Sequence, residues 1–269
     1  MKKILATALL AASAAGIAAP LPAAAKPFTE IKFGVDATYP PFESMSPGGQ
    51  FVGFDIDLGK AICAQLKVKC VFVSQGFDGI IPALEARKFD AILSSMTVTP
   101  VRAQQIDFTS EMYNEPTSLI TKKGAGLLPT AASLKGKTIG VESGTIQESY
   151  AKAYWQPNGV NVVSYPGQDQ VYADLLSGRL DASLQDSVEA DYGFLKTPKG
   201  ADYQLAANVT YDPKDVLGSY IAIGVRKDEP KLKAKIDGAI AAILANGTYK
   251  KIESKYFTFD VYAATPAKS

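Results

Sequence analysis

The chain has 269 residues, with 28 lysines and arginines, 27 aspartates and glutamates, and no histidine. The lack of histidine excludes a Ser-His-Asp triad, a Cys-His pair and any imidazole metal ligand, and two cysteines are too few for a Cys₄ zinc site. A net charge of +1 without a basic run argues against a nucleic-acid partner. The length suits one large domain or two of ordinary size.

The first 25 residues have the pattern of a secretory signal peptide. Lys2 and Lys3 precede an uncharged apolar stretch that begins at Ile4, and Ala23–Ala25 supplies the small residues that signal peptidase reads. A membrane anchor is the alternative, but the apolar stretch is short and two prolines interrupt its end. We expect cleavage after Ala25, without a lipid anchor because no cysteine lies at the cut, and a soluble protein exported to the periplasm.

Two cysteines, Cys63 and Cys70, lie at the end of a predicted helix and the start of a predicted strand. An oxidising compartment favours a disulfide between them. Two free buried thiols are one alternative. A redox-active pair is another, although the C-x-x-C spacing typical of such pairs is absent.

Strand patterns alternate with helix patterns in two successive series. The first series comprises strands Ile31–Val35, Val71–Val73 and Ala91–Ser95 and helices Asp55–Leu66 and Phe77–Arg87. The second comprises strands Lys137–Val141, Val160–Tyr165 and Ala182–Leu184 and helices Gln147–Tyr154 and Gln168–Leu176. Such alternation predicts two α/β lobes, each with a parallel sheet covered on both faces.

The last part of the chain carries one more strand pattern and two helices, at Tyr220–Val225, Pro230–Leu244 and Gly247–Tyr256. If this part returns to the first lobe, two strands cross between the lobes. The predicted bounds are then residues 26–114 and 218–262 for lobe 1, 115–217 for lobe 2 with the crossover segments, and 263–269 for a disordered tail. Ligands bind at the carboxyl ends of strands in open α/β sheets, so lobes that face each other by these edges form a cleft.

Six segments in order carry a resemblance to a known family: FGVDATYPPFES, GFDIDLGKAIC, FDGIIPALEARKFDAILSSMTVTPVR, LKGKTIGVESGTIQESY, SGRLDASLQD and NGTYKKIESKYF. Together they resemble the periplasmic amino-acid-binding proteins of ABC importers, and most closely the lysine/arginine/ornithine-binding and histidine-binding members. The resemblance covers essentially the whole mature chain, including the cysteine pair. It implies a type II periplasmic binding protein fold: two lobes, each a mostly parallel sheet flanked by helices, joined by two crossover strands.

The same resemblance implies a function without catalysis, cofactor or metal. The ligand is then a basic L-amino acid, namely arginine, lysine, ornithine or histidine, and the partner is an ABC permease at the inner membrane. We expect a monomer. An opine or another guanidino compound stays open as the ligand.

Roles for the ligand's backbone groups follow from the resemblance. Arg102 matches the arginine that clamps the α-carboxylate, which a planar guanidinium can bind bidentately. Ser94, Ser95, Thr97 and Thr145 accompany it in the predicted ligand site. The alternative for Arg102 is a solvated side chain at a helix start. Asp186 is predicted to bind the α-ammonium, assisted by Ser95, and an N-cap role for Asp186 is compatible with this.

The ligand's side chain is predicted to lie between two aromatic rings, Tyr39 and Phe77. Asp36 matches the carboxylate that receives the distal amine. Glu142 stands where the related proteins have an uncharged residue, and a second carboxylate would favour a cation; the alternative is a solvent-facing side chain. Gln147 and Asp55 are weaker candidates for the same end of the pocket.

An enzyme is the second function class, because periplasmic cyclohexadienyl dehydratases share this fold. Such an enzyme needs an acid placed to protonate a leaving hydroxyl. Here Arg102 and Asp186 form an amino-acid clamp instead, and Asp36 with Glu142 would oppose a substrate that carries a second carboxylate.

Overall fold

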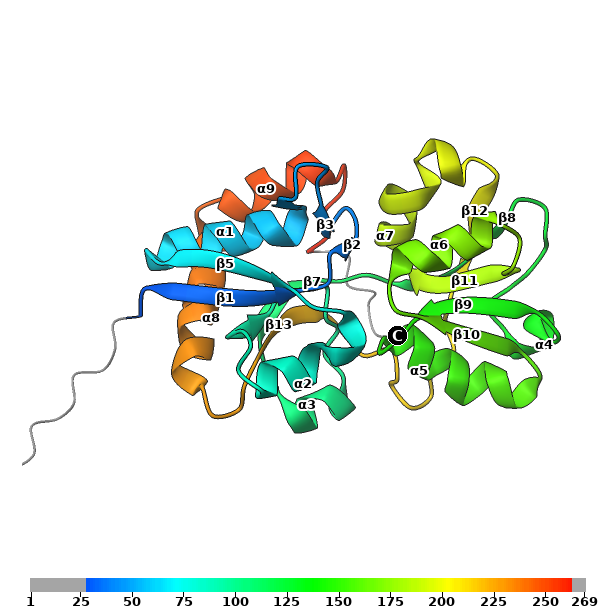
Figure 1. Ribbon diagram of the computed structural model, residues 1–269, viewed down its shortest axis with the longest axis horizontal. Coiled ribbons are helices and arrows are strands. Elements are labelled where there is room, and N and C mark those ends of the chain that lie inside the picture. Colours follow the sequence, from blue (N-terminus) through cyan, green and yellow to red (C-terminus); the bar gives the residue numbers. More distant parts are fainter. Residues whose placement is uncertain (1–27, 263–269) are drawn as a thin grey trace, which may run out of the picture.

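A computed structural model describes residues 28–262 of the chain. The predicted signal peptide and the predicted disordered tail lie outside these residues. Figure 1 shows two lobes, each built on a sheet with helices on both faces. The predicted two-lobed α/β fold is therefore confirmed. Among the described residues, no helix is both long and apolar enough to cross a membrane.

The sheet of lobe 1 has five strands with one antiparallel member. Its order is β5 (Lys69–Ser74), β1 (Glu30–Val35), β6 (Ala91–Ile92), β13 (Ile221–Val225) and β7 (Asp107–Tyr113). β1 pairs in parallel with β5 and β6, whereas β13 runs antiparallel to β6 and β7. The C-terminal strand thus belongs to the sheet of the first lobe.

The sheet of lobe 2 repeats this plan. Its order is β10 (Asn161–Tyr165), β9 (Thr138–Glu142), β11 (Ala182–Asp186), β8 (Thr117–Lys122) and β12 (Tyr203–Asn208). The first three strands are parallel, and β8 is antiparallel to β11 and β12. The chain passes between the two sheets twice, from β7 to β8 through residues 114–116 and from β12 to β13 through residues 209–220. The predicted lobe bounds stay predictions.

Helices cover both faces of each sheet. Lobe 1 carries α1 (Phe54–Leu66), the 3₁₀ turn η1 (Phe77–Gly79), α2 (Ile80–Glu85), α3 (Pro100–Gln105), α8 (Pro230–Ala245) and α9 (Thr248–Tyr256). Lobe 2 carries α4 (Ala131–Leu134), α5 (Ile146–Tyr150), η2 (Ala151–Trp155), η3 (Gln156–Asn158), α6 (Gln168–Leu176), α7 (Ser187–Glu189), η4 (Ala190–Leu195) and η5 (Pro198–Gly200).

The alternation of side chains along the strands divides each lobe's core into two layers. In β13, Ile221 and Ile223 face the layer with α1, α8 and α9, whereas Ala222 faces the layer with α2. In β8, Leu119 and Ile120 likewise point to opposite layers of lobe 2. Both faces of each sheet are therefore buried, which explains why the strands read as nearly continuous apolar runs.

The connection between β1 and α1 forms a small three-stranded sheet that the sequence pattern did not predict. Its strands are β2 (Thr38–Tyr39), β3 (Glu43–Met45) and β4 (Phe51–Val52). The predicted strand Ala91–Ser95 is also shorter than expected. β6 ends at Ile92, and Ser95 has a left-handed backbone with φ of 46°.

Cys63 and Cys70 form a disulfide between α1 and β5. The predicted pairing is confirmed, and the alternatives of free thiols do not hold.

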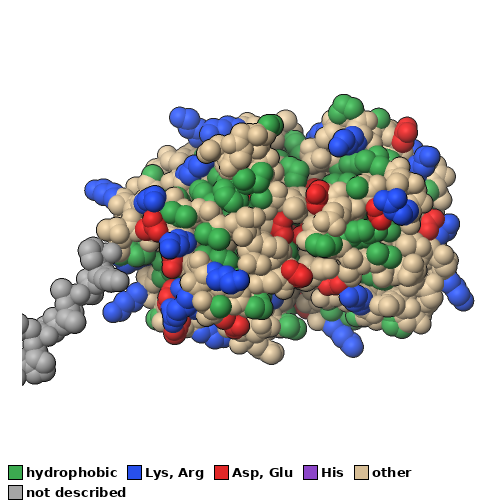
Figure 2. All heavy atoms as spheres, viewed as in Figure 1, with side chains coloured by type: hydrophobic (Ala, Val, Ile, Leu, Met, Phe, Trp, Pro, Cys, Tyr) green, Lys and Arg blue, Asp and Glu red, His purple; other side chains and the backbone are tan. Residues whose placement is uncertain are grey.

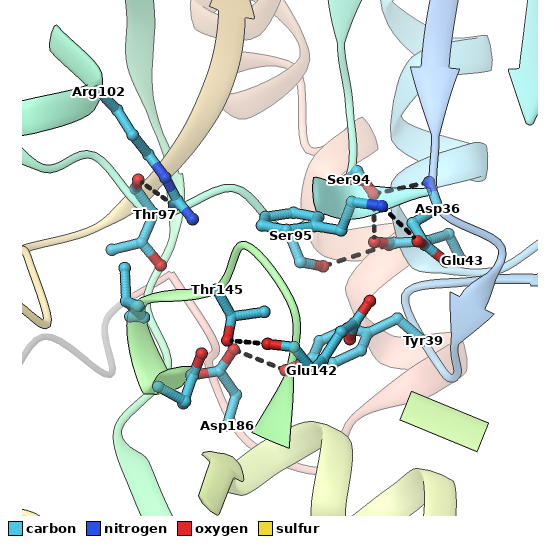
Figure 3. A pocket seen from close by; sticks show the side chains of 13 residues that line it. Asp36, Tyr39, Glu43, Ser94, Ser95, Thr97, Arg102, Glu142, Thr145 and Asp186 are labelled. Carbon is cyan, nitrogen blue, oxygen red and sulfur yellow. Dashed lines mark hydrogen bonds between the residues drawn. The ribbon is translucent and has the colours of Figure 1, made fainter. Parts of the chain in front are cut away.

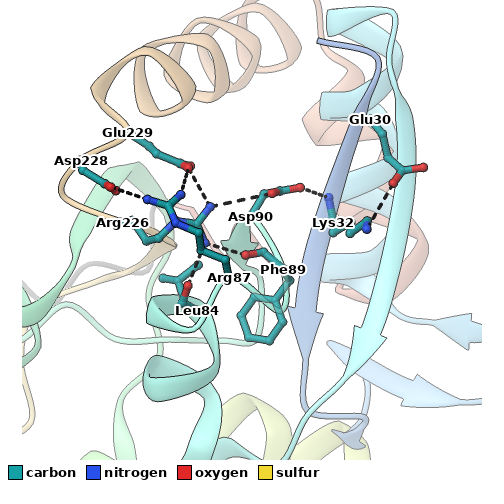
Figure 4. A network of polar contacts seen from close by, with 9 residues as sticks. All are labelled: Glu30, Lys32, Leu84, Arg87, Phe89, Asp90, Arg226, Asp228 and Glu229. Carbon is teal, nitrogen blue, oxygen red and sulfur yellow. Dashed lines mark hydrogen bonds and ion pairs between the residues drawn. The ribbon is translucent and has the colours of Figure 1, made fainter. Parts of the chain in front are cut away.

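A buried arginine fastens the end of β13 to the rest of lobe 1 (Figure 4). Arg226 donates from Nη1 to the carbonyls of Leu84 and Phe89, at 2.8 and 2.7 Å. Its Nη2 pairs with Glu229 at 2.8 Å, just before α8. These bonds hold together α2, the loop before β6 and the connection between β13 and α8.

Candidate functional site

A cavity lies between the lobes, at the carboxyl ends of the parallel strands. Residues of both lobes line it: Asp36, Tyr39, Glu43, Phe77, Ser94, Ser95, Thr97, Arg102, Glu142, Thr145, Ile146, Gln147 and Asp186. Acidic side chains lie along the junction of the lobes on the face seen in Figure 2.

Arg102 lies at one end of the cavity (Figure 3), on α3. Thr99 caps this helix, since its hydroxyl accepts from the Arg102 backbone N–H. Arg102 is only 8% exposed. Its guanidinium donates to the carbonyls of Thr97 at 2.8 Å and Gly144 at 3.1 Å, and its Cζ lies 5.3 Å from the centroid of the Phe77 ring. These bonds use two of the five N–H groups of a guanidinium, so donors remain for an anion. The alternative of a solvated arginine is therefore wrong.

Asp36 and Glu43 lie at the opposite end of the cavity in Figure 3. Asp36 accepts from the backbone N–H of Phe77 at 2.8 Å and from Thr38, which fixes the turn after β1. Glu43 accepts from the hydroxyls of Ser94 at 3.1 Å and Ser95 at 3.2 Å. Glu43 was not among the predicted site residues, because its burial depends on the β2–β3–β4 sheet, which the sequence pattern does not reveal.

Asp55, a predicted site residue, does not line the cavity. It lies in the first turn of α1, behind Ser95, and accepts from the Ser95 backbone N–H at 3.1 Å and the Tyr113 hydroxyl at 2.8 Å. Asp55 therefore holds the left-handed turn at Ser95 in place, and its contact with a ligand would be indirect.

Asp186, at the end of β11, lies in the wall from lobe 2. It accepts from the Tyr39 hydroxyl across the cavity and from the Gln147 side-chain amide, both at 2.7 Å. Its side chain makes no capping hydrogen bond to α7. The capping role is therefore not observed, and contact between Asp186 and a ligand stays a prediction. Gln147 belongs to the Asp186 side of the site.

Glu142, at the end of β9, also faces the cavity and is only 4% exposed. The alternative of a solvent-facing glutamate is wrong. Thr145 donates to the Glu142 carbonyl at 2.7 Å and caps α5 by accepting from the Glu148 N–H. This turn brings Glu142, Thr145 and Gly144 to one edge of the cavity.

Burial dominates the electrostatics of the site. It raises the pKa of Asp186 to about 6, although Tyr39 and Arg102 oppose the shift, and it raises the pKa of Asp36. It also holds the pKa values of Glu43 and Glu142 well above their usual range. The negative charge of Asp55 raises the pKa of Glu43 further, and that of Asp36 raises the pKa of Glu142 further. The cavity thus holds four carboxyl groups beside one guanidinium, and ionising all four without a further cation is unfavourable.

Every predicted ligand-site residue except Asp55 lines the cavity, and Glu43 and Ile146 join them. Ile146 follows Thr145 directly, so its position could have been inferred from that of its neighbour. Within residues 28–262, no group of three or more Cys, Asp or Glu side chains is arranged to hold a metal ion.

The fold and the interlobe cavity define a two-lobed ligand-binding protein. Residues 31–259 match the bacterial extracellular solute-binding proteins, family 3, and the chain belongs to this family.

Three relatives are similar over most of their length. The histidine-binding periplasmic protein of Salmonella typhimurium is 45% identical over 87% of this chain and 89% of its own. The L-arginine-binding protein of Pseudomonas aeruginosa is 46% identical over 98% and 100%. The lysine/arginine/ornithine-binding periplasmic protein of Escherichia coli is 45% identical over 97% and 98%. The resemblance inferred from the six segments is confirmed.

Two solved structures are similar to this one. An ancestral arginine-binding protein bound to arginine has a TM-score of 0.78 and 35% identity, covering 85% of this chain and 98% of its own. An ancestral amino-acid-binding protein described as a precursor of cyclohexadienyl dehydratase has a TM-score of 0.74 and 31% identity, covering 85% and 96%.

Proposed function

We propose that this protein captures a basic L-amino acid between its two lobes in the periplasm and delivers it, as a monomer, to an ABC-type permease at the inner membrane. The similarity to histidine-, arginine- and lysine/arginine/ornithine-binding proteins supports this proposal. Export depends on the predicted signal peptide, which a cleavage site after Ala25 would remove.

The ligand's backbone groups have partners on both lobes. Arg102 binds the α-carboxylate, helped by Thr97 and the Thr145 backbone, and Asp186 binds the α-ammonium. Tyr39 and Phe77 cover the methylenes of the side chain. A ligand that touches both lobes stabilises the closed arrangement, because only there can it make both sets of contacts.

The observation that carries the choice of ligand is the excess of carboxyl groups. After Arg102 and Asp186 are matched to the backbone groups of an amino acid, three buried carboxyl groups remain: Asp36, Glu43 and Glu142. A cationic side chain compensates their charge, whereas a second carboxylate is repelled. Arginine is the ligand we favour, because its planar fork of donors can serve carboxylates from both lobes at once.

Calorimetric titration of the mature protein tests the proposal. We expect binding of arginine, lysine, ornithine and histidine, weaker binding of glutamine, and none of glutamate. Prephenate is included because it is the substrate class of the enzyme alternative. Binding and turnover of prephenate, without binding of basic amino acids, would replace this proposal with the dehydratase.

A further inference from the structure

The lobes meet at a second place, outside the cavity. There, α7 and η4 of lobe 2 face the segment after α9 and the turn between β2 and β3 of lobe 1 (Figure 1). Val188 is buried within the apolar core of lobe 1 although it belongs to α7. The Tyr192 ring lies edge-on to Phe257, with centroids 5.4 Å apart, and 6.3 Å from Phe259. None of these side chains lines the cavity.

A glycine permits this approach. A Cβ at Gly193 would lie 2.3 Å from the Pro40 carbonyl oxygen of lobe 1, far inside van der Waals contact. Gly193 belongs to the helical segment η4, so its own backbone conformation does not require glycine. A Cβ there would meet the Pro40 backbone of the other lobe most closely and would also lie 2.8 Å from Glu189 Oε1 of its own lobe. The two lobes can therefore reach their present distance only with a bare Cα at this position.

We call Val188, Tyr192 and Gly193, with their partners Pro40, Phe257 and Phe259, the rim contact. We infer that the rim contact sets the ligand affinity without touching the ligand, because it stabilises the closed arrangement of the lobes. This inference rests on the proposed function. Its residues are positioning residues, since they act through the geometry of the cavity.

The mechanism is a shift between two arrangements. When only the closed arrangement makes all the ligand contacts, the apparent dissociation constant rises as the closed fraction falls. A weaker rim contact lowers that fraction by the same factor for every ligand. Affinities should therefore fall in parallel, with the ratio between arginine and lysine preserved. Most of the loss should appear as faster dissociation.

Gly193→Ala is the first test, with Gly238→Ala as the matched control. Both are helical glycines, but a Cβ at Gly238 meets nothing within 4 Å. We expect Gly193→Ala to weaken arginine and lysine binding by about tenfold or more and equally, with faster release in stopped flow. X-ray scattering at subsaturating arginine should give a larger radius of gyration than for the control.

Phe259→Ala is the second test, because it removes an exposed ring and should not prevent folding. Phe28→Ala is its control, because Phe28 lies at the far end of lobe 1 and is similarly exposed. Phe259 is 40% exposed and Phe28 is 37% exposed. Loss of the one aromatic pair that Phe259 makes across the lobes, with Tyr192, should weaken the binding of both ligands by roughly two- to tenfold.

The outcomes separate this inference from the proposed function. If wild type binds and both rim variants match their controls within twofold, the rim contact has no role in affinity. A changed arginine-to-lysine ratio would also overturn the inference, because it would place the effect in the cavity. A wild-type protein that binds no basic amino acid overturns the proposed function, and the inference with it.

Discussion

The two walls of the cavity differ in how firmly their polar groups are held. In the wall from lobe 1, Ser94 and Ser95 both donate to Glu43, and Asp55 accepts from the Ser95 backbone N–H. In the wall from lobe 2, Glu142 lies at a strand end, and Asp186 takes one of its bonds from lobe 1, through Tyr39. Lobe 1 thus presents a preorganised half-site, and lobe 2 adds charges whose positions depend on closure. Preorganised groups lower the cost of ordering on binding.

Removal of Arg102, the cation in the cavity wall from lobe 1, should have the largest effect on ligand affinity. Arg102→Ala would leave the ligand carboxylate buried without its partner, which typically costs about 2–5 kcal/mol, or roughly 30- to several-thousand-fold in affinity. Calorimetry with arginine measures the loss. Arg179→Ala, on the exposed surface of lobe 2, is the control. Binding within threefold of wild type would contradict the clamp.

Glu142→Gln tests the wall from lobe 2. The change keeps the shape and removes one negative charge, so arginine binding should weaken by about 1–3 kcal/mol, in line with a hydrogen bond to a charged group. Neutral ligands should bind much as before, and acidic ones should be rejected less. The exposed Glu85→Gln is the charge-matched control. Unchanged arginine affinity would mean that selectivity rests on lobe 1 alone.

Glu43→Gln should have a smaller effect than Glu142→Gln, which sharpens the comparison. Two serine hydroxyls already donate to Glu43, so lobe 1 itself holds this carboxyl group and it depends less on a cation from the ligand. We expect a loss of about 0.5–1.5 kcal/mol in arginine affinity. An effect that exceeds that of Glu142→Gln would refute the view that lobe 1 is the more firmly held wall.

The pH dependence of binding should be the mildest effect near neutrality. Burial raises the pKa of Asp186 to about 6, and an ammonium partner would lower it, so the free site holds more protons than the complex. The affinity is then highest well above pH 6 and falls as the pH drops through that value. For one proton, the fall is at most about tenfold per pH unit. Titrations between pH 8 and 5 in buffers of different ionisation enthalpy would measure this. A constant affinity across that range would show that Asp186 does not pair with the ligand.

Sequence patterns predicted the parts of the molecule that repeat with a regular period. Helices α1 and α6 and strand β1 were predicted within a residue or two, because apolar positions recur at helical or strand spacing. Most cavity residues were placed correctly because they follow predicted strands, where an α/β sheet opens to its ligand.

The errors arose where the chain leaves regular structure. Strands β2 and β4 have two residues each, too few for a periodic signal, so Glu43 was missed. Asp55 was placed in the pocket because the sequence does not tell which side of a helix's first turn faces the cavity. The predicted strand Ala91–Ser95 was too long, because an apolar run does not indicate the left-handed backbone at Ser95 that follows the strand.

The position of β13 between β6 and β7 has a consequence for how the chain folds. The sheet of lobe 2 uses one continuous stretch, from Thr117 to Asn208, and can be completed as soon as that stretch is free to fold. The central hydrogen bonds of the other sheet await Ile221–Val225, whose pairing with β6 closes a loop of more than a hundred residues. Such non-local pairing forms slowly. The half-site that holds Arg102 is therefore completed only after the end of the chain arrives, although most of its residues emerge first.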